Sequence, residues 1–312
     1  MPLNQKDKLT ANNQLYKIIL LSLFLLCQSL FAQKKYVFIP SFESGKNYRL
    51  IINHNGVMKD VEGKEYHKYE IKQKVLLKLI QPVNDYFLYS WKIEDYNNGD
   101  AKCKCIQSFV PKLDFQFKTS SSGEYLGINN LENLKLQIKS ILTKDFIKEF
   151  KKTRKDRYDA EQHLFSIKNN PEFLIAQIEK DILKYFRFYN SKFDSKPMSY
   201  SKVYRNNLSN ERMKMPYSVS STFIEKDGFY QSMFISNLDK KNATTEDWKS
   251  IFNGLDKDLD EFKKRYTSSI EETYVFSSKT GNVDEISIHI KENTSSHNNS
   301  TRIENFALKL VD

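Results

Sequence analysis

The sequence predicts an α+β protein, in which a curved antiparallel sheet has amphipathic helices packed on one face. Long segments alternate apolar and polar side chains with a period of two, which is typical of strands with one packed and one wet face. Other segments repeat apolar residues every three or four positions, which is typical of helices that bury one stripe. Because these two kinds of segment are segregated along the chain, α+β is favoured over α/β.

Residues 36–130 have the pattern of strands. Between residues 68 and 93, apolar side chains alternate with lysines, stop near Asn84 and Asp85, and then resume. This pattern predicts a long β-hairpin. Residues 113–117 give a further strand, which a turn rich in serine and glycine ends.

Three amphipathic helices are predicted, with apolar stripes within residues 131–150, 173–186 and 248–266. Asn130 is expected to cap the first helix, because its side-chain oxygen can accept a hydrogen bond from an unpaired amide in the first turn. Pro171 begins the second helix at the position that tolerates proline. Thr244 and Asp247 resemble a capping box at the start of the third helix.

The remaining segments alternate between irregular sequence and strands. Residues 189–217 contain prolines, serines and asparagines, and a linker and a surface loop explain them equally well. Asp227 and Gly228 then separate two alternating segments and predict a two-residue hairpin turn, because such a turn requires positive φ values. Closing strands are predicted within residues 274–276, 286–290 and 306–310.

Residues 1–32 are predicted to be a secretory signal peptide. A basic start precedes a short apolar run, and Ala32 supplies the small residue at the cut. The run is shorter than the roughly 20 apolar residues of a spanning helix, but Leu30 suits the cut poorly, so an uncleaved anchor is the alternative. Lipid attachment at Cys27 is disfavoured, because Leu26 precedes it instead of a small residue.

The end of this leader, residues 29–33 (Ser-Leu-Phe-Ala-Gln), resembles the signal ends of many exported proteins of Gram-negative bacteria. The resemblance implies a periplasmic or extracellular product, peripheral to the outer membrane as a further option, and it implies no activity. In outline, the predicted architecture also resembles curved-sheet carrier proteins of the bacterial envelope. Residues 33–312 are expected to form a single α+β domain, with a subdivision into 33–190 and 191–312 as the alternative.

The net charge of +10 favours weak attraction to polyanions. For an exported protein, an acidic lipid surface or a polysaccharide is a more plausible polyanion than nucleic acid. The candidate anion patch is a run of basic residues after the first helix, Lys148, Lys151, Lys152, Arg154 and Lys155. The simpler explanation of this run is the solvated side of a helix.

No cofactor is predicted. The glycines form no phosphate-binding pattern, no serine lies in G-x-S-x-G, and no H-E-x-x-H zinc motif occurs. Cys103 and Cys105 fit an intramolecular disulfide poorly, because their side chains point the same way on a strand. Two reduced or capped thiols are the simpler interpretation, while a strained turn bridge, a bridge to another chain and capture of a soft metal stay open.

The leading hypothesis is a non-catalytic envelope protein that binds an apolar or polypeptide ligand on the concave face of the sheet. Candidate lining residues are apolar positions of the predicted strands, Leu77, Leu79, Phe87, Tyr89, Trp91, Phe115 and Phe117. The alternatives are a hydrolase whose Asp, Glu or His residues meet on folding, and a structural or adhesive surface module. Candidate ligands are a lipid, a polysaccharide or a polypeptide.

A second set of aromatic residues could line a ligand groove or stack on sugar rings. These residues follow the second predicted helix closely or belong to its end, and they are Tyr185, Phe186, Phe188, Tyr189 and Phe193. Because aromatic residues at helical spacing usually belong to a core, core packing is the simpler explanation.

Overall fold

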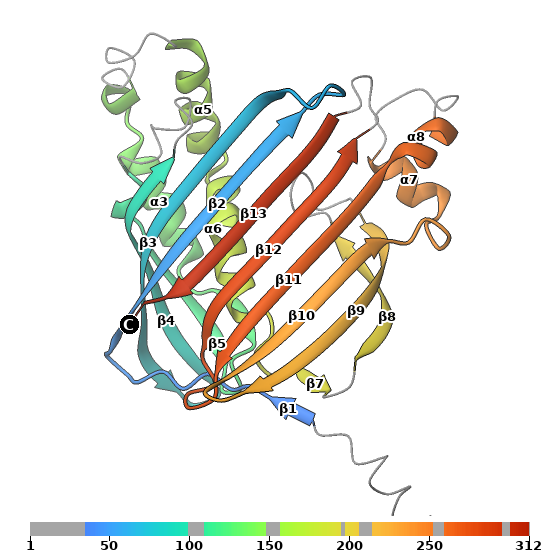
Figure 1. Ribbon diagram of the computed structural model, residues 1–312. Coiled ribbons are helices and arrows are strands. Elements are labelled where there is room, and N and C mark those ends of the chain that lie inside the picture. The colour runs from blue at the N-terminus through green and yellow to red at the C-terminus, as the bar shows by residue number, and fades with distance from the viewer. Residues whose placement is uncertain are drawn as a thin grey trace, which may run out of the picture.

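The computed structural model describes residues 35–98, 109–147, 157–194, 197–205, 214–251, 259–294 and 300–311. One large antiparallel sheet dominates this part of the chain, and helices lie on one of its faces (Figure 1). The predicted α+β fold with a curved antiparallel sheet is therefore confirmed. A small second sheet pairs β1 (Lys35–Val37) with β7 (Lys192–Asp194).

The large sheet has eleven strands. Their order across the sheet is β6 (Tyr125–Ile128), β5 (Asp114–Ser120), β4 (Tyr86–Asn98), β3 (Glu65–Val83), β2 (Asn47–Lys59), β13 (Ser300–Leu310), β12 (Val283–Thr294), β11 (Thr267–Ser277), β10 (Phe229–Leu238), β9 (Lys214–Lys226) and β8 (Met198–Arg205). Neighbours are consecutive in the chain except where β2 pairs with β13, so two meanders meet in the middle of the sheet. The number of domains stays a prediction.

Both predicted hairpins are confirmed. In the long hairpin of β3 and β4, Asn84 takes a positive φ of 33° at the turn. In the hairpin of β9 and β10, Gly228 has a φ of 90°, whereas Asp227 is not among the residues with positive φ. Only the second turn residue therefore uses the left-handed region, for which glycine is suited.

The helices are α3 (Leu131–Ile141), α5 (Arg157–Asn169), α6 (Pro171–Phe186), α7 (Thr245–Ile251) and α8 (Leu259–Arg265). Helix α6 begins at Pro171 as predicted and lies behind the sheet in Figure 1, against the concave face. Helix α3 ends at Ile141, earlier than its apolar stripe predicts. The third predicted helix is described as two helices, α7 and α8, because residues 252–258 lie outside the described part.

One predicted cap is confirmed and the other is wrong. Thr244 and Asp247 each accept a hydrogen bond from the other's backbone N–H, at 3.1 and 2.8 Å, which is the predicted capping box. Asn130 makes no cap bond to α3. Its amide instead accepts from Gln116 N at 3.0 Å and donates to Asp114 O at 2.7 Å. The Asn130 side chain, which was predicted to cap the helix, therefore bonds the backbone of β5 instead.

Residues 189–217, for which a linker and a loop were equally expected, include strands β7 and β8 and the start of β9. Strand β8 is an edge strand that pairs with β9, where Met198 lies opposite Ser221. The apolar alternation of β8 covers only Met198 and Tyr200 before Lys202 takes the next position on that face, so the segment is too short to stand out as a strand.

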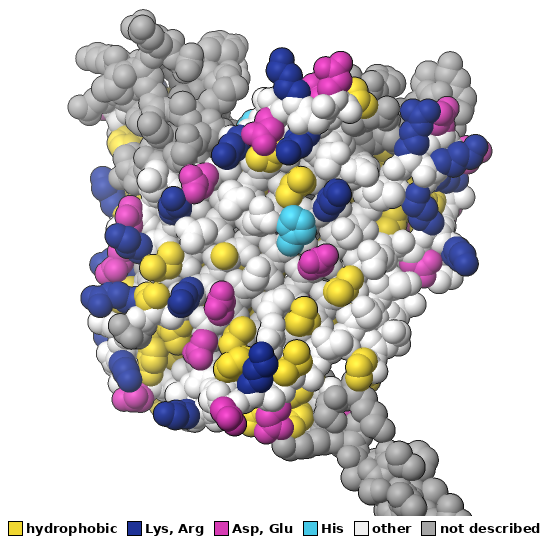
Figure 2. Space-filling model, viewed as in Figure 1, with side chains coloured by type: hydrophobic (Ala, Val, Ile, Leu, Met, Phe, Trp, Pro, Cys, Tyr) yellow, Lys and Arg dark blue, Asp and Glu magenta, His cyan; other side chains and the backbone are white. Residues whose placement is uncertain are grey.

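The outer face of the sheet is the face toward the viewer in Figures 1 and 2. Lysine, arginine and acidic side chains lie scattered there among apolar ones (Figure 2). Exposed apolar residues of this face include Ile51 on β2, Ile224 on β9 and Ile235 on β10. Scattered apolar side chains of this kind are normal for a protein surface.

Candidate functional site

The lining residues predicted from sequence lie on the concave side of β3, β4 and β5, beneath helix α6. All of them are buried in the core except Phe87, which is partly buried and packs against that core: Leu77, Leu79, Phe87, Tyr89, Trp91, Phe115 and Phe117. The ring of Phe186 lies 5.5 Å from that of Tyr89, and the ring of Tyr185 lies 6.4 Å from that of Trp91. Helix packing therefore occupies this side of the sheet, and a ligand role for these residues stays a prediction.

The other end of the concave face holds a cavity of about 290 Å³. We call it the aromatic groove. It lies between strands β8, β9 and β10 and the segment that follows α6, and its lining residues are Phe188, Ser191, Lys192, Phe193, Asp194, Met198, Tyr200, Ser221, Thr222, Phe223, Ser232 and Phe234. Small serines on the sheet and large aromatic residues around them leave room for an apolar group.

Aromatic contacts fix the walls of the groove. Phe188 stacks on Phe234 with ring centroids 4.7 Å apart, and it meets the ring of Tyr274 edge-on at 4.4 Å. Phe193 lies 5.7 Å from Phe223 between ring centroids. Such ring pairs contribute about 0.5–1.5 kcal/mol beyond the area that they bury. The walls are therefore held in place by packing.

The segment that carries Phe188 and Phe193 leaves α6 through a tight turn. Asn190 has a positive φ of 61°, and its N–H donates to the carbonyl of Phe38 at 3.0 Å. Strand β7 then pairs with β1, where Phe193 lies opposite Tyr36. The second aromatic set of the sequence is thus divided: Tyr185, Phe186 and Tyr189 belong to the core, while Phe188 and Phe193 also line the aromatic groove.

Charged residues lie next to the aromatic groove. Arg187 forms an ion pair with the buried carboxylate of Glu272, and its guanidinium carbon lies 5.0 Å from the centroid of the Phe188 ring. Lys202 follows Tyr200 by two residues on β8, so both side chains are on the same face. Burial lowers the pKa of Lys202, the charge of Arg187 lowers it further, and Glu272 opposes them.

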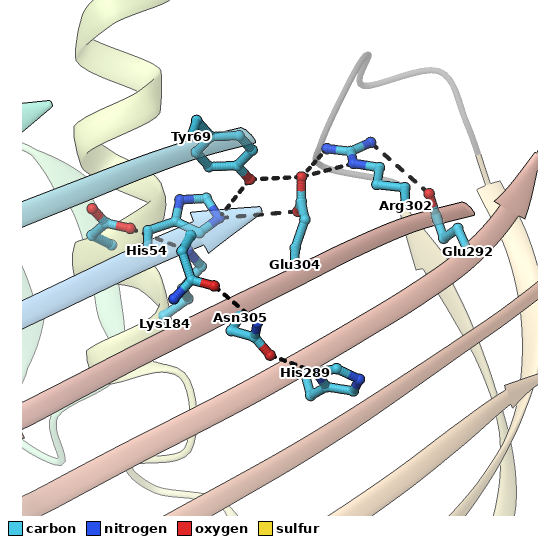
Figure 3. Close-up of polar contacts among 10 residues, drawn as sticks. His54, Tyr69, Lys184, His289, Glu292, Arg302, Glu304 and Asn305 are labelled. Carbon is cyan, nitrogen blue, oxygen red and sulfur yellow. Dashed lines mark hydrogen bonds and ion pairs between the residues drawn. The ribbon is translucent and has the colours of Figure 1, made fainter. Parts of the chain in front are cut away.

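A separate polar network crosses the concave face at β2, β3 and β13 (Figure 3). The hydroxyl of Tyr69 donates to Oε1 of Glu304 at 2.8 Å, and Nε of Arg302 donates to the same oxygen at 2.7 Å. Nε2 of His54 lies 3.2 Å from the Tyr69 hydroxyl and 4.0 Å from Oε2 of Glu304. Charge-assisted bonds therefore converge on one oxygen, Oε1, of a carboxylate that is almost fully buried.

The network continues toward β11 and β12. Arg302 lies 3.9 Å from Oε2 of Glu292. The other oxygen of that carboxylate, Oε1, accepts from the hydroxyls of Ser268 and Tyr266 at 3.5 Å each. Burial raises the pKa of Glu292, and Arg302 opposes this. Burial lowers the pKa of His54, and the charge of Lys184 on α6 lowers it further. Both effects favour the neutral form of the His54 imidazole.

The aromatic groove and the polar network differ in chemistry. The ionisable side chains that line the groove are Lys192, Asp194 and Tyr200. The network joins His, Glu, Arg and Tyr, but these groups bond one another. Within the ranges that the structure describes, no three His, Cys, Asp or Glu side chains are grouped so as to hold a metal ion.

Two sets of predicted residues lie outside the described part of the chain. They are the candidate anion patch, Lys148, Lys151, Lys152, Arg154 and Lys155, and the cysteine pair, Cys103 and Cys105. The predicted leader, residues 1–32, also lies outside it. Of the helices in the described ranges, none combines the length and the apolar character needed to cross a membrane.

Comparison with known proteins gives a distant likeness. No protein-family model matches the chain, and no curated protein matches it. Among solved structures, the chain is similar to one described as lipid–protein interactions in lipovitellin, with a TM-score of 0.46 and 9% sequence identity. The match covers 87% of this chain and 25% of that one, so this chain spans about a quarter of the length of the lipovitellin chain.

Proposed function

We propose that the protein is a non-catalytic binding protein whose apolar ligand lies in the aromatic groove. The observation that carries the proposal is the groove itself, where Phe188, Phe193, Phe223 and Phe234 surround a space of about 290 Å³ above the serines of β9 and β10. Ligand sites in proteins are concave, are lined mainly by apolar and aromatic side chains, and measure about 300–1,000 Å³. The volume fits a slender apolar chain at the lower end of that range.

The proposed ligand still binds the concave face, but at the aromatic groove instead of against the lining residues that were predicted from the sequence. A ligand against Trp91 or Tyr89 would have to displace α6, whose Tyr185 and Phe186 are fully packed there. Truncation of a single buried aromatic side chain costs about 3–5 kcal/mol, so exposure of two of them is unfavourable. No helix has to leave the aromatic groove, so binding there does not carry this cost.

We also propose that the protein is exported and acts in the bacterial envelope. The support is the leader of residues 1–32, with its basic start, its short apolar run and the small Ala32 at the cut. Export predicts that the mature protein begins at Gln33. Mass spectrometry of the intact protein from a Gram-negative host tests this, since a product that retains Met1 would contradict it.

A filled-groove variant tests the binding site. Ser221 lies on the concave side of β9 and lines the aromatic groove, whereas its neighbour Ser220 is exposed on the outer face. In Ser221→Phe, the added ring occupies the groove. Ser220→Phe makes the same chemical change on the same strand and leaves the groove open, so it is the matched control.

The readout is the fluorescence of N-phenyl-1-naphthylamine, a neutral apolar dye that brightens out of water. We expect saturable binding to the wild-type protein and to Ser220→Phe, and at least a tenfold loss of affinity in Ser221→Phe. Thermal unfolding of both variants checks that they are folded. Equal dye binding by the two folded variants would show that the ligand does not lie in the aromatic groove.

A further inference from the structure

We infer that the ligand is an uncharged apolar chain that ends in a hydroxyl group, and that this hydroxyl donates a hydrogen bond to the carboxylate of Asp194 in the aromatic groove. The inference rests on the proposed function and adds the chemical class of the ligand. Its basis is an acceptor that the fold leaves unbonded, together with the charges that lie beside that acceptor.

Asp194 brings a carboxylate to the wall of the aromatic groove. It is the last residue of β7, and among the described residues that line the groove only Asp194 carries a carboxylate. Its Oδ1 atom is buried and has no hydrogen-bond partner within the described ranges. Because an aspartate turns readily about χ2, either oxygen can face a donor in the groove.

An unbonded carboxylate oxygen is costly in such a place. Buried polar groups in folded proteins almost always have a hydrogen-bond partner, and the cost of lacking one is larger for a charged group than for a neutral one. Phe193 and Phe223 belong to the same lining, so the carboxylate stands among apolar walls. A hydrogen-bond donor on the ligand removes this cost, so the groove favours a ligand that carries one.

The charges beside Asp194 favour a neutral donor over an ammonium group. Lys35 on β1 lies directly opposite Asp194 in the small sheet, and Lys192 lies two residues before it on β7. Both lysines are exposed, so their ammonium groups stay hydrated and interact weakly with Asp194. An ammonium head group would meet one carboxylate and two cations here, and it therefore gains little net attraction.

An anionic head group is disfavoured by the same carboxylate. A ligand carboxylate offers only acceptors near neutral pH, so it leaves Oδ1 of Asp194 unbonded and places a like charge beside it. A hydroxyl can donate to Asp194 and still accept from water. We therefore place the head group at β7, with the chain extending toward Phe188 and Phe234, whose rings stack on each other.

Displacement of N-phenyl-1-naphthylamine from the full protein near neutral pH tests the class of ligand. The four competitors share one chain length and are dodecanol, its methyl ether, dodecanoate and dodecylamine. We expect dodecanol to displace the dye at least about tenfold better than the methyl ether, which has no proton to donate to a charged acceptor. Dodecanoate should be weaker than dodecanol. Tighter binding of dodecylamine or dodecanoate than of dodecanol would overturn the assignment of a neutral head group.

Two substitutions on β7 test the place of the head group. Asp194→Leu removes the acceptor, whereas Lys192→Leu removes a charge from the same strand and the same lining. We expect Asp194→Leu to bind dodecanol and its methyl ether equally well, and Lys192→Leu to keep the preference for dodecanol. Each preference is a ratio within one variant, so a general change of affinity does not alter it. Asp194→Asn keeps the shape of the side chain and should also reduce the preference, which covers the case that Asp194→Leu does not fold.

The outcomes separate this inference from the proposed function. Equal binding of dodecanol and its methyl ether by the wild-type protein would overturn the inference and leave an apolar ligand in the groove. A preference for dodecanol that survives unchanged in the folded Asp194 variants would do the same. If Ser221→Phe also binds the dye as Ser220→Phe does, the proposed function itself is wrong.

Discussion

The ring of Tyr69 on β3 lies over Gly56 on β2, the residue directly opposite it in the sheet. From there the hydroxyl reaches Glu304 on β13, which pairs with Gly56 from the other side. A Cβ atom on Gly56 would lie 2.3 Å from Cε1 of Tyr69, closer than two carbon atoms can approach. The absence of a side chain on the middle strand therefore lets Tyr69 bond a carboxylate two strands away.

Gly56→Ala is predicted to destabilise the protein by about 1–3 kcal/mol, because the ring of Tyr69 must move and its bond to Glu304 is lost. Urea denaturation of the single variant measures this loss. Tyr69→Ala removes the ring, so Gly56→Ala should cost little when made in that background. Additive costs in the double-mutant cycle would show that the ring does not depend on Gly56.

Tyr69→Phe should cost more stability than Tyr266→Phe. Tyr69 donates to Glu304 at 2.8 Å, whereas Tyr266 lies 3.5 Å from Glu292, at the limit of a hydrogen bond. Loss of a bond to a charged group costs about 1.5–3 kcal/mol, and the longer contact should contribute less than about 1 kcal/mol. Chemical denaturation of the two variants compares them directly, and equal losses would contradict this ranking.

His54 is predicted to make the protein less stable in acid. Burial lowers its pKa in the folded state below the ordinary value of 6.5, so the unfolded chain takes up the proton first. The free energy of unfolding should therefore fall as the pH drops below about 6.5 toward the folded pKa, and it should recover above that value. His54→Gln removes this contribution.

Glu292 must be separated from that effect, because it acts with the opposite sign. Burial raises its pKa above the ordinary 4.5, so the folded state keeps its proton longer, and stability falls as the pH rises through that window. Denaturation series of wild type, His54→Gln, Glu292→Gln and the double variant between about pH 4 and pH 8 separate the two. If His54→Gln leaves the acid limb of the wild-type curve unchanged, His54 is not the group responsible.

Arg187→Met should destabilise the protein more than the isosteric Glu272→Gln. Glu272 is 2% exposed, so replacement of Arg187 takes away the guanidinium that pairs with a buried carboxylate. A broken buried pair costs about 3–5 kcal/mol, and the partial exposure of Arg187 lowers the expected loss to about 2–3 kcal/mol. The double variant Arg187→Met with Glu272→Gln should recover part of this loss, and a double variant as unstable as the sum of both changes would contradict the pairing.

The sequence was sufficient for the parts of the fold that local patterns encode. Alternation around Leu77 and Tyr89 identified a hairpin with one packed face, and Pro171 with its apolar stripe identified α6, because burial of one face imposes the periodicity directly. Strand β8 was missed because its apolar alternation ends after Met198 and Tyr200, where Lys202 takes the next position on the concave face.

The site depended on contacts that no local pattern records. Tyr69 and Glu304 are 235 residues apart in the sequence. A charged residue on the concave face of a strand also cannot be distinguished, from the alternation alone, from a charged residue on the outer face. The groove arises because the turn at Asn190 carries Phe188 and Phe193 over β9 and β10. The sequence shows many aromatic residues near Phe193, but both a packed core and the wall of a groove produce such a cluster, so the sequence alone does not distinguish them.

The most direct measurement of the central claim is photocrosslinking with a fatty alcohol that carries a diazirine in its chain, followed by peptide mass spectrometry. Binding in the aromatic groove predicts labels on peptides that contain Phe188, Phe193, Phe223 or Phe234, and competition by unlabelled dodecanol. Labels that dodecanol competes away from peptides containing Trp91, Phe115 or Phe117, with none in the groove, would contradict it and place the ligand beneath α6.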